Sequence, residues 1–197
     1  NLFSFLNMGL AAFVLSAIAA RFVFPAISME GAAFWIIRAA PVSLKTFLWI
    51  KFFVYYIPLI LLAELLVVCS NLLLQVSSFM SVLSILTIFC LVPGVVAMGI
   101  GLGAIYPDFQ SENPAQTVTS FGGLLFMILS LALIAVVIVL EAGPVYYIFV
   151  SGMRHQSLTP WQMAWFAGSF TIALFLCIFA VAYPMRLGEK SLREMQR

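Results

Sequence analysis

Charged residues are scarce in this sequence. Lys, Arg, Asp and Glu together make up 8% of its 197 residues, and the net charge is only +2. A soluble domain is on average about a quarter charged, because polar groups must cover its surface. This chain is instead 64% hydrophobic, which excludes an ordinary water-soluble domain. Its few basic residues are not pooled into the surface that a nucleic-acid partner would need.

The residue patterns of common catalytic and metal sites are also missing. The sequence has no GxSxG motif, no His/Glu pair within an apolar run and no paired carboxylates within a predicted helix. Its one His, His155, stands beside Arg154 without a second ligand at metal-binding spacing. Cys69, Cys90 and Cys177 lie in apolar runs without CxxC spacing, so we interpret them as packing residues. The sequence therefore predicts no catalytic residues and no metal site.

Long apolar runs are what the sequence has instead. Five of them reach the roughly 20 residues that a membrane-spanning helix needs. They lie at about 2–20, 47–74, 79–106, 121–140 and 161–183. We therefore predict an all-α polytopic membrane protein whose residues 1–197 form a single transmembrane domain. Because the chain starts with Asn1 and is already apolar there, we expect it to be the C-terminal part of a longer protein.

A shorter helix is predicted at about 28–40, between the first two spans. Ser28 is a suitable N-cap and Glu30 a favourable first-turn residue, while Pro41 pushes the preceding residue out of the helical conformation. Glu30 and Arg38 fall roughly 80° apart on the helix, and most of the remaining surface is apolar. Such a helix is too short to cross a bilayer, so we expect it to lie along the membrane surface.

The basic residues are distributed unevenly between the two sides of the predicted membrane. Eight lie in the loop after the first span, at the start of the second span or in the C-terminal tail, whereas the opposite side has only Arg154. The eight are Arg21, Arg38, Lys45, Lys51, Arg186, Lys190, Arg193 and Arg197. Loops rich in Lys and Arg stay on the cytoplasmic side. We therefore predict a multi-pass plasma-membrane protein with a cytoplasmic 21–46 loop and a cytoplasmic C-terminus.

One carboxylate lies near the middle of the second predicted span. Glu64 is followed at seven and eleven residues by Asn71 and Gln75, which a helix would place on the same face. An ionisable group at this depth costs about 3 kcal/mol on insertion scales, so its side chain should face protein or water rather than lipid. Two interpretations stay open: a substrate or proton site, or a protonated Glu64 that is hydrogen-bonded to a neighbouring helix.

The glycine spacing of the run Gly99-Ile100-Gly101-Leu102-Gly103 is superficially similar to that of a nucleotide-binding loop. A loop of that kind needs a strand before it and an acidic residue further on, and neither is predicted here. Gly99 and Gly103 are four residues apart on an apolar helix, a spacing that lets a second helix approach closely. We therefore interpret them as helix-packing residues.

The segment after the first span also carries a resemblance to a known family. It contains Glu30-Gly31, an apolar stretch, Arg38-Ala39-Ala40-Pro41-Val42-Ser43, and then Leu48 and Lys51. Together these residues resemble the cytoplasmic segment of type-2 permeases of ATP-binding-cassette exporters, which forms a coupling helix on the ATPase subunit. The later run GLGAIYPDFQSENPAQTVTSFGGLLFMI is similar to a bacterial subgroup of exporter permeases. The resemblance covers most of the chain from Arg21 to Ile128.

This resemblance implies a transmembrane permease subunit of an ATP-driven exporter. No Walker motif occurs in the sequence, so ATP would be bound by a separate ATPase subunit and this chain would hold no cofactor itself. The implied partners are the ATPase, the lipid bilayer and a second permease half or copy. The residues that would contact the ATPase are Glu30, Gly31, Arg38, Pro41 and Ser43. The family's Arg after the Glu is absent, since Gly31 follows Glu30 directly.

Two other functions have less support in the sequence. A secondary transporter using Glu64 as a proton site would need inverted repeats and a charge partner in another span, and neither is visible in the sequence. A membrane-embedded enzyme would need a nucleophile or a set of metal ligands, which is also not visible. The exporter permease is therefore the leading prediction.

Overall fold

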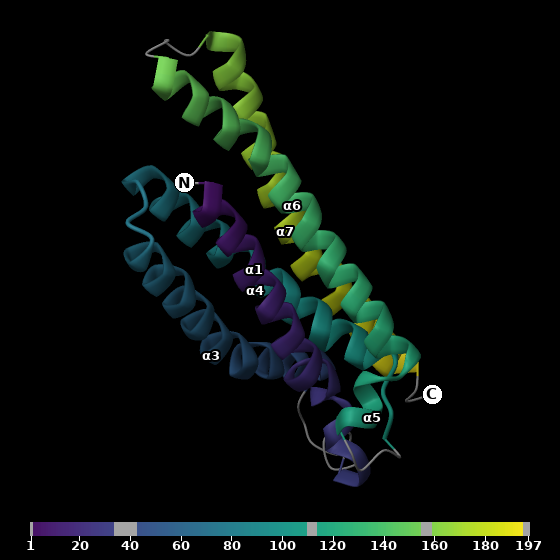
Figure 1. Cartoon of the computed structure of the whole chain (residues 1–197). Helices are drawn as coiled ribbons and strands as arrows, with labels where there is room; N and C mark the ends of the chain where they lie inside the picture. The colour runs from purple at the N-terminus through teal and green to yellow at the C-terminus, as the bar shows by residue number, and fades with distance from the viewer. Residues whose placement is uncertain (1, 34–42, 110–113, 155–158, 195–197) are drawn as a thin grey trace.

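The structure, a computed structural model, describes residues 2–33, 43–109, 114–154 and 159–194. In these residues all regular secondary structure is helical (Figure 1). The long helices are α1 (Leu2–Phe22), α3 (Leu44–Leu73), α4 (Ser78–Ile105), α6 (Phe121–Arg154) and α7 (Pro160–Glu194). The short ones are η1 (Phe24–Ala26), η2 (Ser28–Ala33) and α5 (Pro114–Val118). Five helical segments are long and apolar enough to cross a membrane, which confirms the predicted fold class.

The long helices alternate in direction. One end of the bundle holds the start of α3 and the C-terminal ends of α1, α4 and α7, and we call it the Ser43 end. The opposite end holds the turn between α3 and α4, and we call it the Ser77 end. Figure 1 shows the N-terminus toward the Ser77 end and the C-terminus at the Ser43 end.

The last two long helices extend well past the predicted spans. α6 has 34 residues and α7 has 35, whereas the sequence predicted spans that end at about residues 140 and 183. A helix of this length measures about 50 Å, against roughly 30 Å for the hydrocarbon core of a bilayer. In Figure 1 the pair of α6 and α7 reaches beyond the other helices at the Ser77 end.

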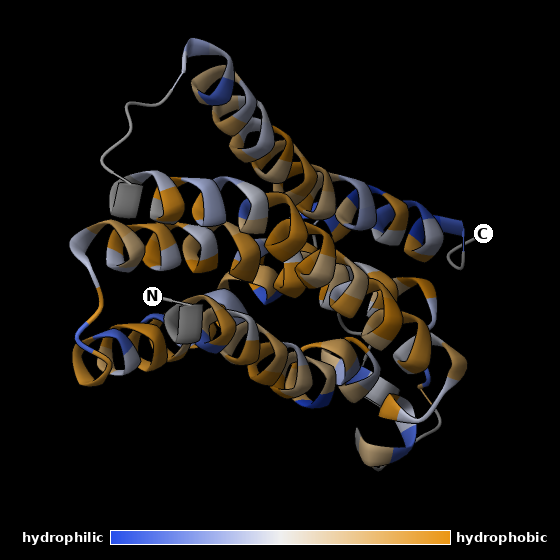
Figure 2. Cartoon of the chain, turned by 45° about the horizontal axis from the view of Figure 1, so that its top comes forward, coloured by the Kyte–Doolittle hydropathy of each residue, from blue (hydrophilic) through white to orange (hydrophobic). Residues whose placement is uncertain are grey.

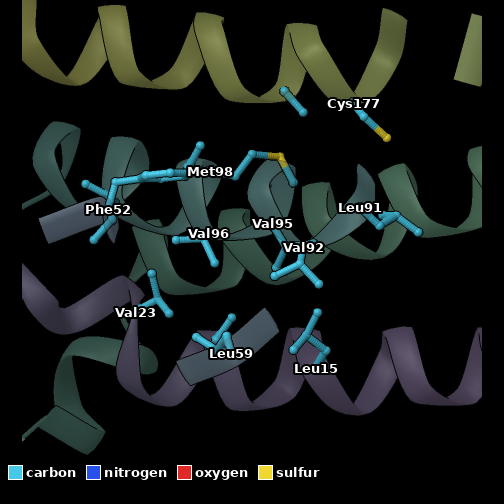
Figure 3. Packing of buried hydrophobic residues seen from close by; sticks show 14 of the residues in the cluster. Leu15, Val23, Phe52, Leu59, Leu91, Val92, Val95, Val96, Met98 and Cys177 are labelled. Carbon is cyan, nitrogen blue, oxygen red and sulfur yellow. The ribbon is translucent and has the colours of Figure 1, made fainter. Parts of the chain in front are cut away.

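Helix α4 forms the centre of the bundle. It packs against α1, α3, α6 and α7, and its residues are buried without interruption from Gly94 to Ala104. Figure 3 shows α4 side chains such as Val92 and Val95 between Leu15 of α1 and Cys177 of α7. The core is therefore built around one helix that is apolar on all sides.

The outer surface of the bundle is also apolar. Leu61, Leu65 and Leu73 of α3 and Phe175 of α7 are all more than half exposed. Figure 2 shows hydrophobic residues along the lengths of the helices and hydrophilic ones gathered near the C-terminus and in some of the turns. A soluble monomer rarely exposes apolar surface on this scale, whereas a bilayer covers it.

Two of the long helices begin at capping residues. Ser43 has an extended backbone, and its hydroxyl accepts a hydrogen bond from the backbone N–H of Thr46 at 3.1 Å, which starts α3. At the start of α7, the side-chain oxygen of Gln162 accepts hydrogen bonds from the backbone N–H and the hydroxyl of Thr159, at 3.0 and 2.9 Å. These local contacts set where the two helices enter the bundle.

Candidate functional site

The predicted surface helix at 28–40 is not a regular helix in its described part. Ser28–Ala33 is a 3-10 segment interrupted at Gly31, whose φ of 43° and ψ of −125° lie outside the helical region. Glycine adopts a positive φ without the steric cost that other residues meet. The prediction of one continuous helix is therefore wrong for these residues, because Gly31 turns the chain inside its first turns. Residues 34–42, with Arg38 and Pro41, lie outside the described residues.

Ser28 is buried and does not cap its own segment as predicted. Its hydroxyl accepts a hydrogen bond from the backbone N–H of Asp108 at 3.0 Å. Asp108 lies just beyond the end of α4, so this bond ties the segment after α1 to the chain that leaves the central helix.

Glu30 forms an ion pair with Lys51 of α3. The two side chains are 24% and 21% exposed, and the Lys51 ammonium also lies 5.8 Å from the ring centroid of Phe47. A partly exposed pair of this kind contributes up to about 1 kcal/mol. Its larger effect is positional, because it links the segment after α1 directly to α3.

Of the five residues predicted to contact an ATPase, three fall within the described part. Glu30, Gly31 and Ser43 all lie at the Ser43 end. The same end has a hollow of about 280 Å³ between the start of α3 and the end of α7. Lys45, Trp49, Arg186 and Glu189 are among the residues that line it. The Ser43 end therefore offers charged groups of both signs, set around a recess.

Glu64 and Asn71 both lie on α3, seven residues apart and thus on the same helical face, whereas Gln75 is not on that face as predicted. Gln75 lies beyond the last residue of α3 and has a positive φ of 47°, so it does not share a helical face with Glu64. Asn71 is buried, and its side-chain N–H donates a hydrogen bond to the hydroxyl of Ser84 in α4 at 2.7 Å. Within the described part of the chain, neither carboxylate oxygen of Glu64 has a hydrogen-bond partner.

Gly99 and Gly103 lie where α4 meets η1 and the residue before it. A Cβ atom on Gly99 would come within 2.8 Å of Cγ1 of Val23, and one on Gly103 would overlap the carbonyl oxygen of Phe24. Both glycines are buried. Their environment is a close contact between two chain segments, which a larger residue would force apart.

A second carboxylate inside the bundle, Glu141 of α6, is only 4% exposed. The hydroxyl of Thr87 in α4 donates to it and lies 2.9 Å from each carboxylate oxygen. Hydroxyl groups of Ser16 and Ser130 form a similar contact between α1 and α6, at 2.7 Å. Buried polar pairs of this kind hold neighbouring helices in register.

Glu141 also lines a cavity of about 380 Å³ between α4, α6 and α7. Its other polar or sulfur-bearing lining residues are Thr87, Cys90 and Cys177, and the rest of the wall is apolar. No Lys or Arg is among the described residues that line it. Within the described residues, no group of three or more His, Cys, Asp or Glu side chains is placed to hold a metal ion.

A comparison with known families covers the full length of the chain. The sequence model of the family described as "Putative ATP-binding cassette" matches residues 1–197. The chain belongs to this family. No curated protein and no solved structure matches it.

In this member of the ATP-binding cassette family, the sequence reasoning missed Glu141. The predicted fourth span ended at about residue 140, so Glu141 fell outside it, although α6 continues to Arg154. The signal was available, because apolar residues resume directly after Glu141 and an acid within a long apolar run is costly unless it is paired. Its partner Thr87 is 54 residues away, and no local pattern links the two.

Proposed function

We propose that the chain is the transmembrane permease subunit of an ATP-driven exporter, with ATP bound and hydrolysed by a separate subunit. The family match over residues 1–197 and the five apolar helices support this proposal. The observation that carries it furthest is the double attachment of the segment after α1. Ser28 is bonded to Asp108 beyond α4, and Glu30 is paired with Lys51 of α3.

This attachment gives the segment a mechanical role. A force on residues 28–33 would reach α3 through the Glu30–Lys51 pair and the end of α4 through the Ser28–Asp108 bond. Because α4 packs against the four other long helices, a movement of α4 would displace those helices as well. Closure of an ATPase against this segment would thus shift the spans relative to one another.

The distribution of charge supports an ATPase contact at the Ser43 end. Six of the described basic residues lie there: Arg21, Lys45, Lys51, Arg186, Lys190 and Arg193. Among the described Lys and Arg residues, only Arg154 lies toward the opposite end. Under the positive-inside rule the Ser43 end faces the cytoplasm, where ATP is available. The proposal includes a second permease half or copy beside this chain in the plasma membrane.

The test is a charge exchange at the Glu30–Lys51 pair. Glu30→Lys alone breaks the pair, whereas Glu30→Lys with Lys51→Glu restores it with the charges reversed. Each variant of the full-length protein is purified from its own membranes, and co-purifying ATPase and ATP hydrolysis in proteoliposomes are measured. We expect the single variant to lose coupling between hydrolysis and transport, and the exchange to regain most of it.

A matched control is Lys190→Glu, a charge reversal on an exposed residue of α7 at the same end. It should co-purify and couple like the parent protein. If the single Glu30 variant also captures the ATPase and couples normally, this segment does not transmit the force and the proposal fails.

One observation favours a second candidate, a proton-coupled secondary transporter. Within the described part of the chain both carboxylate oxygens of Glu64 are buried without a hydrogen-bond partner, so no hydrogen bond holds this acid in one protonation state. Such a transporter would move its substrate in proteoliposomes with a pH gradient and no ATP. The exporter proposed here would not.

A further inference from the structure

We propose that the cavity beside Glu141 is a binding site for a lipophilic monovalent cation that reaches it from the bilayer. Binding of such a cation is a property of this chain alone. That the cation is also a transported substrate rests on the proposed export function.

The first support is that the Glu141 carboxylate can accept more hydrogen bonds than the described residues donate to it. A carboxylate group has about four lone-pair sites for hydrogen bonds, and among the described residues the only donor to Glu141 is the Thr87 hydroxyl. The ion pairs in the described residues all lie toward the Ser43 end, and none includes Glu141. The carboxylate therefore keeps acceptor sites for a ligand.

The second support is the nature of the walls. Apart from Thr87, Cys90, Glu141 and Cys177, the lining is apolar, and none of it is basic. In a low-dielectric site a cation beside a carboxylate gains much more than in water, while an anion is repelled. A small hydrated cation such as Ca²⁺ needs six to eight oxygen ligands, which these walls do not provide. The chemistry fits an apolar molecule with one positive charge.

The third support is access. Helices α4 and α7 pack tightly at the Ser43 end, where a Cβ on Gly188 would lie 2.9 Å from the carbonyl oxygen of Gly101. Figure 1 shows the pair of α6 and α7 diverging from α3 and α4 toward the Ser77 end. Phe79 and Leu86 of α4 and Leu174 of α7 line the cavity and are 47%, 57% and 47% exposed. These side chains lie on the apolar outer surface, so a molecule dissolved in the bilayer can enter between them.

The size of the cavity limits the ligand. Its volume of about 380 Å³ lies near the lower end of small-molecule sites, which span roughly 300–1,000 Å³. Glu141 lies twenty residues after the start of α6 at Phe121, or about 30 Å along the helix. The cavity is thus in the half of the bundle nearer the Ser77 end, away from the proposed ATPase contact.

The test uses two probes of the same shape and opposite charge. Tetraphenylphosphonium is the cation and tetraphenylborate the matched anion. Equilibrium dialysis measures their binding to the full-length protein in nanodiscs, with empty nanodiscs as the partitioning background and with no ATP or ATPase present. We expect saturable binding of the phosphonium and none of the borate.

Two variants locate the site. Glu141→Gln keeps the size of the side chain and an oxygen that can accept the Thr87 hydrogen bond, so the helix contact survives while the charge is lost. It should bind the phosphonium about tenfold more weakly or worse. Ala173→Phe leaves Glu141 in place and fills the cavity, and it should also abolish binding. Glu194→Gln and Ala135→Phe, both at exposed positions outside the cavity, are the matched controls and should bind like the parent.

Size-exclusion chromatography and thermal unfolding establish that each variant is folded, and Ala173→Phe provides the test if Glu141→Gln does not fold. Equal phosphonium binding by the parent and by a folded Glu141→Gln variant would overturn the proposal, as would saturable binding of the borate. If the protein captures no ATPase, the proposed export function is overturned, while the phosphonium-binding result still holds. The proposed export function and the proposed cation site can therefore fail separately.

Discussion

At the scale of single residues, two acidic side chains within the membrane-spanning helices have different surroundings. Glu141 is buried and accepts a hydrogen bond from Thr87, which a core position between helices requires. Glu64 is half-buried, and its carboxylate has no hydrogen-bond partner in the described part of the chain. One of the two interpretations of Glu64 was a hydrogen bond to a neighbouring helix, and among the described residues its carboxylate has no such partner. The acid that is bonded between helices is Glu141, which was not predicted.

This difference predicts the effect of replacing Glu64. Because no described group would lose a hydrogen bond, Glu64→Leu should leave the free energy of unfolding in nanodiscs unchanged, or raise it by up to about 3 kcal/mol. Glu64→Gln should transport like the parent if ATP drives export. A less stable Leu variant would reveal a partner for Glu64. Loss of transport by a normally expressed Gln variant would favour the proton-coupled alternative.

At the scale of elements, the contact of α4 with η1 requires that residue 103 have no side chain. The Cβ of an alanine at Gly103 would overlap the carbonyl oxygen of Phe24, and backbone cannot move aside as a flexible side chain can. Gly103→Ala should therefore lower the free energy of unfolding by about 1–3 kcal/mol.

Gly168→Ala is the control for this prediction. Gly168 is an exposed residue of α7, and in the described part of the chain no atom beyond its chain neighbours and the backbone of its own helix lies within 4 Å of a Cβ placed on it. Because alanine is the better helix former, this variant should be neutral or more stable by up to about 1 kcal/mol. Reversible unfolding of both variants in the same nanodiscs is the measurement. A Gly103→Ala protein as stable as Gly168→Ala would show that the contact between α4 and η1 can relax.

The elements that could be predicted from the sequence are those whose signal is local. Long apolar runs located all five spans, because a bilayer requires some twenty apolar residues in a row wherever the chain crosses it. The extent of α6 was missed, because the predicted fourth span ended at about residue 140 whereas the helix continues to Arg154. The helix at 28–40 was predicted from capping and apolar pattern, and the positive φ of Gly31 interrupts it. A glycine permits such a turn without requiring it.

The contacts that build the candidate sites could not be predicted in this way. The Ser28–Asp108 bond joins residues 80 positions apart, and the Thr87–Glu141 bond joins residues 54 apart. Each depends on which helices are neighbours, and hydrophobicity alone does not encode that arrangement. Glu30 and Ser43 fall at the same end because the sequence places both in the segment between the first two spans. The partner of Glu30, Lys51, emerges only from the three-dimensional structure.

At the scale of the whole molecule, the charge distribution predicts an orientation. Single cysteines are introduced at Ser191 and Thr159, at opposite ends of α7, in a protein whose exposed Cys69 is replaced by Ala. In intact cells an impermeant thiol reagent should label the Thr159→Cys variant and leave Ser191→Cys unlabelled until the membrane is opened. Labelling of Ser191→Cys in intact cells would show that the orientation is the reverse of this prediction, with the Ser43 end on the outer side of the membrane.

The central claim is that an ATPase subunit docks on the Ser43 end of this bundle. The most direct measurement is photo-cross-linking in native membranes, with a photoreactive amino acid placed at Lys45 or at Leu73. Both positions are exposed and both lie on α3, at opposite ends of the helix. The account predicts that the probe at Lys45 forms an adduct with a protein that binds ATP, and that the probe at Leu73 forms none. An ATPase adduct from Leu73, or none from Lys45 when the protein is inserted and expressed normally, would contradict it.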